Sequence, residues 1–195
     1  MRFVGWIVAA ALTVPAAPGA AEVWQYGQSD CNQLWFMRNL IMDRAGYCFG
    51  TNLGKSLYDN GDCTGKQVHL SGDESRQVKK IKALETRIGC KVNTGGTSLD
   101  VPMKSNLLRL RDMPLPADGG WGCLGWAGRA APIHDGYSSG RRVIGSIDPG
   151  DNVFFGFLGE GGWSPVIVAK GGNGGKEILG WIDASLDPVC TSEAG

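Results

Sequence analysis

The sequence predicts an α+β protein, in which a small helical N-terminal domain stapled by disulfide bonds precedes a small β-barrel. Residues 22–92 place apolar side chains at helical spacing behind capping sequences. From Trp121 onward the helical period fades, and short β-prone runs alternate with glycine-rich turns. The chain has six cysteines and no C-x-x-C pair, a pattern that favours disulfide bonds over a zinc site.

The N-terminus has the features of a secretory signal peptide. Met1-Arg2 is a short basic start, and the apolar run Phe3–Val14 has the length of a signal-peptide core. We expect a signal peptide over residues 1–21, with cleavage after Ala21 and with Ala20 as the neighbouring option. The run is shorter than the roughly 20 apolar residues that a membrane span needs. The mature protein is therefore expected to be periplasmic or secreted, with no membrane span.

Length and charge limit the classes of function. Without the first 21 residues the chain keeps about 174, enough for one domain or two small ones. The full chain has 19 basic and 19 acidic residues, and loss of Arg2 leaves 18 against 19, or about −1. This balance argues against a nucleic-acid partner, which would require a basic excess.

The cysteines predict three disulfide bonds in an oxidising compartment. Six cysteines allow 15 pairings, and the sequence alone does not choose among them. Free thiols remain the alternative. Locality along the chain favours Cys31 with Cys90, Cys48 with Cys63, and Cys123 with Cys190.

Two helices are expected in residues 22–92. Asp30 is the predicted cap of the first helix, which ends at Gly46. The capping box Ser71–Glu74 opens the second, which ends at Gly89. The apolar positions are Leu34, Met37, Leu40 and Ile41 in the first helix, then Val78, Ile81, Leu84 and Ile88 in the second. A bond between Cys31 and Cys90 would make the two helices antiparallel.

Residues 34–49, LWFMRNLIMDRAGYCF, resemble the YARHG domain of exported bacterial proteins. The matching positions are Arg38, Asn39, Ile41, Arg44, Gly46, Tyr47 and Phe49. The name-giving letters differ, since Met42, Asp43 and Ala45 replace tyrosine, alanine and histidine. The resemblance implies an extracytoplasmic protein associated with the cell envelope, and it implies no established reaction.

The motif residues are better explained by structure than by ligand binding. Arg38 and Asn39 are expected to hydrogen-bond backbone groups that lack partners. Tyr47 and Phe49 are expected to pack under the disulfide-bound loop. A ligand site at these residues is the alternative.

Residues 93–120 read as a linker with a short helix. Asp100 through Arg111 could form that helix, with Asp100 as its cap. Pro114 and Pro116 end it and mark the boundary before the barrel, which is predicted over residues 121–191.

Five short strands are predicted in the C-terminal half, and five strands with tight connections favour a barrel. They are Ala130–Ile133, Arg142–Ile147, Asn152–Leu158, Ser164–Ala169 and Glu177–Ile182. Gly171–Lys176 separates the last two and is expected to be a hairpin loop. It is not a phosphate-binding loop, because Glu177 stands where serine or threonine would bind magnesium.

Three motifs in this half, in order, resemble a bacterial SH3-like domain. They are Arg142–Gly145 followed by Pro149–Val153, then Gly162-Trp163 with Val166, and last Gly180–Ile182. The family's opening element is degraded here to Gly128–Ser139. The resemblance implies a groove between loops that binds peptides or cell-wall peptide stems. The candidate groove aromatics are Trp126, Tyr137, Trp163 and Trp181; for Trp163 and Trp181, packing in the core or at the rim is the alternative.

No catalytic constellation is found. His69 and His134 lie in different halves, and neither has a partner in sequence. A cysteine nucleophile would need a free thiol. The sequence therefore predicts no catalytic residue, no metal site and no cofactor.

The function expected from the sequence is that of a non-enzymatic exported protein of the cell envelope. It would be a binding or adaptor module for peptide or peptidoglycan through the SH3-like domain. The alternatives are a protein-directed inhibitor or partner of an envelope hydrolase, and an unrecognised hydrolase.

Overall fold

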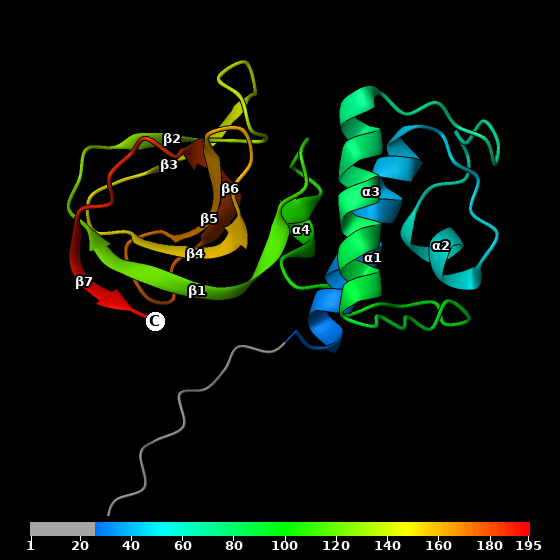
Figure 1. The fold of residues 1–195 in the computed structure, drawn as a ribbon, viewed down its shortest axis with the longest axis horizontal. Coiled ribbons are helices and arrows are strands. Elements are labelled where there is room, and N and C mark those ends of the chain that lie inside the picture. The colour runs from blue at the N-terminus through cyan, green and yellow to red at the C-terminus, as the bar shows by residue number, and fades with distance from the viewer. Residues whose placement is uncertain (1–25) are drawn as a thin grey trace, which may run out of the picture.

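The structure, a computed structural model, describes residues 26–195 and arranges them as a helical half and a sheet half (Figure 1). The predicted signal peptide lies outside the described residues. The helices are α1 (Gln28–Arg44), α2 (Asn52–Leu57), α3 (Gly72–Arg87) and α4 (Lys104–Leu107). The short α4 lies between the other helices and the sheet (Figure 1).

Helices α1 and α3 form the frame of the helical half and run antiparallel. The disulfide Cys31–Cys90 joins the start of α1 to the chain just after α3, with a Cα–Cα distance of 5.2 Å. Fully buried apolar side chains fill the space between the helices and the loop that carries α2, which removes their surface from water. They include Leu34, Phe36, Met37, Leu53 and Ile81.

The predicted ends of the two long helices, α1 and α3, are correct except at the start of α1. The helix begins at Gln28 after Gly27, and Asp30 lies in its first turn, where its carboxylate accepts the Gly27 N–H at 2.7 Å. Asp30 is therefore not the cap that the sequence predicted. At the other end Gly46 has φ of 85°, and a Cβ there would lie 2.8 Å from Thr64 Oγ1, so glycine is required.

The remaining disulfides join Cys48 to Cys63 and Cys123 to Cys190. With Cys31–Cys90 they are the pairs that locality favoured. None of the described cysteines is free.

The sheet half is one antiparallel sheet of seven strands in the order β3-β2-β6-β5-β4-β1-β7. It curls around its own core in Figure 1, but it is not closed. The predicted closed five-stranded barrel is therefore wrong in strand number and in closure. The strands are β1 (Leu115–Trp126), β2 (Ala131–His134), β3 (Val143–Ile147), β4 (Asn152–Leu158), β5 (Trp163–Ala169), β6 (Glu177–Asp183) and β7 (Cys190–Ala194).

The five predicted strands correspond to β2 through β6, and the two strands that were missed are β1 and β7. Strand β1 has four glycines and one proline, so no regular alternation marks it. It pairs with β4 and with β7, both distant in sequence. Pairing with such distant strands cannot be predicted from the residues near β1 alone.

The predicted helix over Asp100–Arg111 is also shorter in the structure. Met103 has φ of 52°, in the left-handed region, so a right-handed helix cannot run through it. Only Lys104–Leu107 is helical, and Asp100 is not its cap.

Strand β6 is buried on both faces, which explains its uninterrupted apolar sequence. Ile178 and Ile182 point into the core of the curled sheet. The alternate residues Leu179 and Trp181 point out of it toward the helical half. The strand therefore joins the two halves.

Candidate functional site

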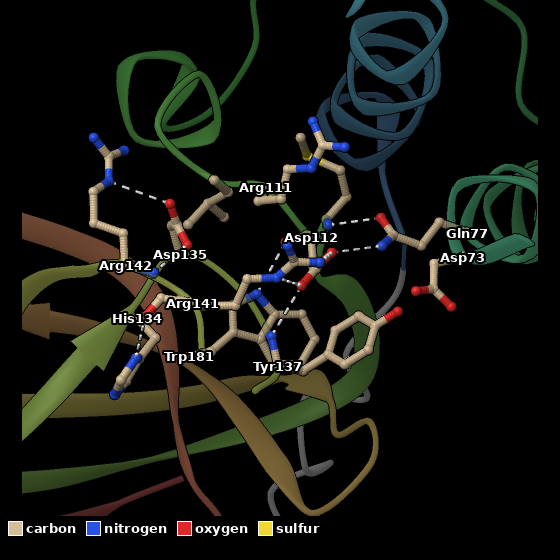
Figure 2. Close-up of polar contacts among 12 residues, drawn as sticks. Asp73, Gln77, Arg111, Asp112, His134, Asp135, Tyr137, Arg141, Arg142 and Trp181 are labelled. Atoms are coloured by element: carbon tan, nitrogen blue, oxygen red, sulfur yellow. Dashed lines mark hydrogen bonds and ion pairs between the residues drawn. The ribbon is translucent and has the colours of Figure 1, made fainter. Parts of the chain in front are cut away.

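A buried carboxylate, Asp112, lies at the junction of the two halves, and its side chain is the centre of a polar network (Figure 2). The residue is 2% exposed. The Arg141 guanidinium donates Nε to Oδ2 at 2.8 Å and Nη2 to Oδ1 at 2.9 Å. The Tyr137 backbone N–H donates to Oδ2 at 3.1 Å. The two hydrogen bonds between Asp112 and Arg141 hold the carboxylate and the guanidinium in fixed orientations.

Helix α3 joins the same network through Gln77, which is buried. Its amide nitrogen donates to Asp112 Oδ1 at 3.1 Å, and its oxygen accepts the Met113 N–H at 2.9 Å. The Trp181 indole N–H donates to the Asp112 carbonyl at 2.9 Å. We call these residues, Gln77, Asp112, Arg141 and Trp181 with the Tyr137 backbone, the Asp112 network.

The loop between β2 and β3 fits closely against this carboxylate. A Cβ at Gly136 would lie 2.0 Å from Asp112 Oδ2, so any side chain there would expel the carboxylate. Asp135 supports the loop, because its carboxylate accepts the Arg142 N–H at 3.1 Å and its carbonyl accepts the Arg111 N–H at 2.7 Å. His134 is buried, with Nδ1 at 3.0 Å from the Arg141 carbonyl.

A cleft of about 370 Å³ opens beside this network, between α3 and the sheet. We call it the α3 cleft. Its floor is apolar, since Ile81, Leu84, Met113 and Trp181 are each at most 5% exposed. Leu158, on the sheet side, is 47% exposed. The residues that line it are Arg76, Gln77, Lys80, Ile81, Ala83, Leu84, Arg87, Met113, Leu115, Tyr137, Leu158, Gly159, Glu160 and Trp181.

Three cations of α3 lie at the rim of the cleft. Arg76 pairs with Asp73, and Lys80 pairs with Glu160 on the loop between β4 and β5. Within residues 26–195, Arg87 has no carboxylate partner. Its guanidinium lies over the Tyr26 ring, 5.9 Å from the ring centre. The rim therefore offers positive charge above an apolar floor.

The predicted groove aromatics do not form one surface. Trp126 is 2% exposed in the core of the sheet, and its N–H donates to the Arg129 carbonyl at 3.0 Å. Trp163 packs edge-on against the ring of His134, with centroids 5.1 Å apart. Only Tyr137 and Trp181 line the α3 cleft, where their rings meet edge to face at 5.3 Å. Figure 2 shows the Tyr137 ring directed away from the sheet toward α3.

The YARHG-motif residues hold the helical half together. Arg38 pairs with Glu85 of α3 at 2.9 Å rather than with backbone, which corrects the prediction for that residue. Asn39 donates to the Trp35 carbonyl at 2.7 Å. Arg44 donates Nη1 to the Leu110 carbonyl at 2.7 Å and thus ties α1 to the segment before Asp112.

The aromatic pair of the motif packs under the disulfide-bound loop. The rings of Tyr47 and Phe49 meet edge-on at 5.1 Å. Phe49 in turn stacks on Tyr58 at 4.6 Å, which belongs to the same loop between Cys48 and Cys63.

The potential metal ligands within residues 26–195 do not gather into a site. No cluster of three or more histidine, cysteine or carboxylate side chains there could hold a metal ion. His69 is exposed, whereas His134 is buried against Trp163. The two are not brought together.

Sequence reasoning missed the centre of the site. Asp112 and Met113 lie in the stretch that reads as linker, and Gln77 looks like one polar residue on a solvated helix. The single available indication was the closely spaced charges of Asp135, Arg141 and Arg142, which a loop of that length could bring together.

Comparisons with known proteins agree with the division into halves. The YARHG domain model matches residues 13–86, which confirms the N-terminal resemblance. The model described as Domain of unknown function (DUF4453) matches residues 89–195. This match does not name an SH3-like domain. No curated protein and no protein of solved structure matches the chain.

Two structural facts bear on location. The three disulfides and the YARHG match fit an extracellular protein. In the part of the chain that the structure describes, no helix is long and apolar enough to cross a membrane.

Because the C-terminal match covers more than half of the 195 residues, the chain belongs to the DUF4453 family and carries a YARHG domain before that region.

Proposed function

We propose that this protein is an exported, non-enzymatic binding module of the cell envelope, located in the periplasm or secreted. Its ligand is a short acidic peptide of the peptidoglycan stem type, held in the α3 cleft. The observation that carries the proposal is the pairing of a buried apolar floor with a rim of three cations.

The chemistry of the cleft matches such a peptide. Ligand pockets are mostly apolar with a few placed polar groups that set orientation. The methyl side chains of a stem peptide suit the floor of Ile81 and Leu84, and its free carboxylates suit the guanidinium groups of Arg76 and Arg87. Glu160, which pairs with Lys80 in the free protein, offers an acceptor for an amino group of the ligand.

The Asp112 network supports the proposal because it fixes one wall of the cleft before any ligand arrives. Asp112 holds the Tyr137 backbone and the Trp181 indole at 3.1 and 2.9 Å. Rigid walls lower the entropy lost on binding. We therefore propose the junction of the halves as the ligand site, in place of the loop groove expected from the sequence.

The SH3-like kinship of the sheet half belongs to the same proposal. Its three sequence motifs fall in order on β3 and the turn into β4, on β5, and on β6. We propose the sheet as an opened relative of that fold, extended by β1 and β7. The peptide preference of SH3-like domains then supports a peptide ligand here.

The test measures binding of purified peptidoglycan and of a fluorescein-labelled synthetic stem peptide to the mature protein. We expect the peptide to bind with affinity that weakens at higher salt, because the rim charges are exposed. Arg87→Gln should weaken binding about fivefold. Ala83→Phe, which places a ring over the floor, should weaken it more than tenfold.

The matched control is Lys82→Gln, which removes the same charge from an exposed position of α3 outside the cleft. It should leave binding within twofold of the wild type. The proposal fails if neither ligand is retained, or if Arg87→Gln and Lys82→Gln have equal effects.

A further inference from the structure

A second groove, of about 670 Å³, lies where the start of α1 approaches β1 and β4. We call it the glycine–aromatic groove. It borders the same strand pair, β1 and β4, as the α3 cleft. Leu115 and Leu158 face one another in register and line the cleft, while the next pair, Pro116 and Phe157, lines the groove. Nothing in the proposed function uses it.

The wall of the groove is an aromatic platform. Trp121 of β1 stacks on Phe155 of β4 with ring centroids 4.4 Å apart and planes 6° from parallel. Trp121 is nevertheless 37% exposed. A stacked pair with an exposed ring provides a rigid surface for a planar or cationic group.

Glycines beside the rings keep the groove open. The pairing of β1 with β4 shifts between Pro116 and Trp121, where β1 bulges. A Cβ at Gly120 would lie 2.7 Å from the Phe155 carbonyl, so the bulge requires glycine there. At Gly156 a Cβ would meet nothing within 4 Å, so its missing side chain is space that a ligand can use.

Gln33 of α1 lines the groove with an amide that has no assigned partner. Its residue is 6% exposed, and no hydrogen bond to its side chain is formed within residues 26–195. The other two buried amide side chains of the helices, Asn39 and Gln77, both have partners. No fully buried side-chain nitrogen or oxygen lacks a partner within residues 26–195, so the Gln33 amide atoms reach the solvent of the groove, where a ligand can bond them.

The charges of the groove have one sign. Among its lining residues the ionisable side chains are Asp30 and Glu177, and no lysine or arginine is present. The α3 cleft, in contrast, is lined by three cations, Arg76, Lys80 and Arg87, and by a single carboxylate, Glu160. The two sites therefore select ligands of opposite charge.

From these observations we propose that the glycine–aromatic groove binds an extended peptide segment in which a lysine or arginine is flanked by apolar residues. The cationic group of the peptide lies against the Trp121 ring and is attracted by the carboxylates of Asp30 and Glu177. The Gln33 amide pairs with a peptide bond of the segment, donating to its carbonyl and accepting from its N–H. Apolar neighbours fill the space beside Gly156.

The charge favours a cationic peptide over a neutral glycan. An N-acetylated sugar chain could stack on Trp121, but it has no positive charge to balance Asp30 and Glu177. An acidic peptide would be repelled by both. The proposal concerns a site separate from the α3 cleft and does not rest on the stem-peptide proposal.

The test uses fluorescence anisotropy with three labelled short peptides on the mature protein. One alternates lysine and leucine, one replaces lysine by glutamate, and one replaces leucine by serine. We expect the first to bind and the other two to bind at least tenfold more weakly. Unlabelled N-acetylglucosamine oligomers should not displace it.

Variants locate the binding. Gly156→Leu should weaken binding of the lysine–leucine peptide more than tenfold by filling the groove. Glu177→Gln should weaken it about threefold, and Gln33→Leu about fivefold. Glu193→Gln, which removes an exposed carboxylate of β7 outside the groove, is the control and should have no effect. Thermal unfolding of each variant shows whether it is folded.

The outcomes separate this proposal from the previous one. Arg87→Gln should leave lysine–leucine binding unchanged, and Gly156→Leu should leave stem-peptide binding unchanged. Equal affinity for the lysine and glutamate peptides would overturn the proposal. So would displacement by the sugar oligomers, or the absence of any effect of Gly156→Leu.

Discussion

The helical half and the sheet half are stabilised by different kinds of interaction. In the helical half two disulfides fix the chain, one of them closing a loop of only 15 residues, and Ser71 with Glu74 forms a local capping box. In the sheet half the longest strand, β1, pairs only with segments far along the chain. Order in the first half can form locally, whereas order in the second requires the whole sheet.

One edge of the sheet also depends on residues that are distant in sequence. Strand β3 is an edge strand, and its outward carbonyls could pair with another chain. Two cations occupy them: Arg109 Nη2 donates to the Ile144 carbonyl at 3.0 Å, and Lys170 Nζ donates to that of Ser146 at 3.0 Å. Arg109 comes from beside α4, so the segment that links the halves also protects the sheet.

Removal of the disulfides tests this comparison most directly and has the largest expected effect on the free energy of unfolding. Cys31–Cys90 and Cys123–Cys190 span 59 and 67 residues, one in each half. The chain-entropy model assigns each about 4 kcal/mol. We expect Cys31→Ala/Cys90→Ala and Cys123→Ala/Cys190→Ala to lower the free energy of unfolding by similar amounts in a single transition, measured by urea denaturation.

Equal losses in one transition would mean that the halves unfold together. The shorter bond, Cys48–Cys63, closes 15 residues and is the internal comparison, with about 3 kcal/mol expected. Two separate transitions in the unmutated protein would contradict a single cooperative unit.

The second prediction tests what couples the halves. Asp112→Ala removes the acceptor of Arg141, Gln77 and the Tyr137 N–H. Removing one partner of a buried ion pair leaves groups unpaired, so we expect a loss of about 3 kcal/mol. The single unfolding transition should also split in two, which calorimetry would detect.

Asp118→Ala is the control, since Asp118 is an exposed carboxylate on the same segment. It should change the free energy of unfolding by less than about 0.5 kcal/mol. If Asp112→Ala had an equally small effect, the Asp112 network would not be what couples the halves.

The same division explains what the sequence could predict. Helix boundaries follow rules that span a few residues. The predicted ends at Gly46 and Gly89 and the predicted start at the Ser71–Glu74 box were correct. Strands β2 to β6 were found because turns separate them. Strand β1 was missed because Gly119, Gly120 and Gly122 break its pattern, and only the distant β4 makes them a strand.

The site was less predictable than the fold for the same reason. Asp112, Gln77 and Arg141 are separated by 35 and 29 residues, and no spacing rule connects them. Trp163 and Trp181 were predicted as groove aromatics at motif positions, but motif positions do not tell which face of a strand is covered. Trp181 illustrates this, because its face of β6 is buried by the helical half.

The smallest expected effect on stability comes from carboxylates, whose surroundings differ between the two halves. In the sheet half Lys170 donates to Asp148 at 2.6 Å and also pairs with Asp151, and this contact lowers the pKa of Asp148. In the helical half burial raises the pKa of Asp43, and the nearby charges of Asp62 and Asp59 raise it further. Ionised Asp43 therefore costs stability.

We expect Asp43→Asn to stabilise the protein at pH 7 by a few tenths of a kcal/mol, since solvent screens this partly exposed group. Because the folded-state pKa of Asp43 lies above its unfolded value, the cost is absent below the unfolded pKa. It grows to its full size as pH rises through the folded pKa. The gain from Asp43→Asn should therefore vanish near pH 3, as measured by urea denaturation at both values. Asp62→Asn should give part of the gain, because it removes a charge that opposes ionisation of Asp43. A gain that persisted unchanged at pH 3 would show that the substitution acts through packing, and the contrast with the compensated acids of the sheet half would be lost.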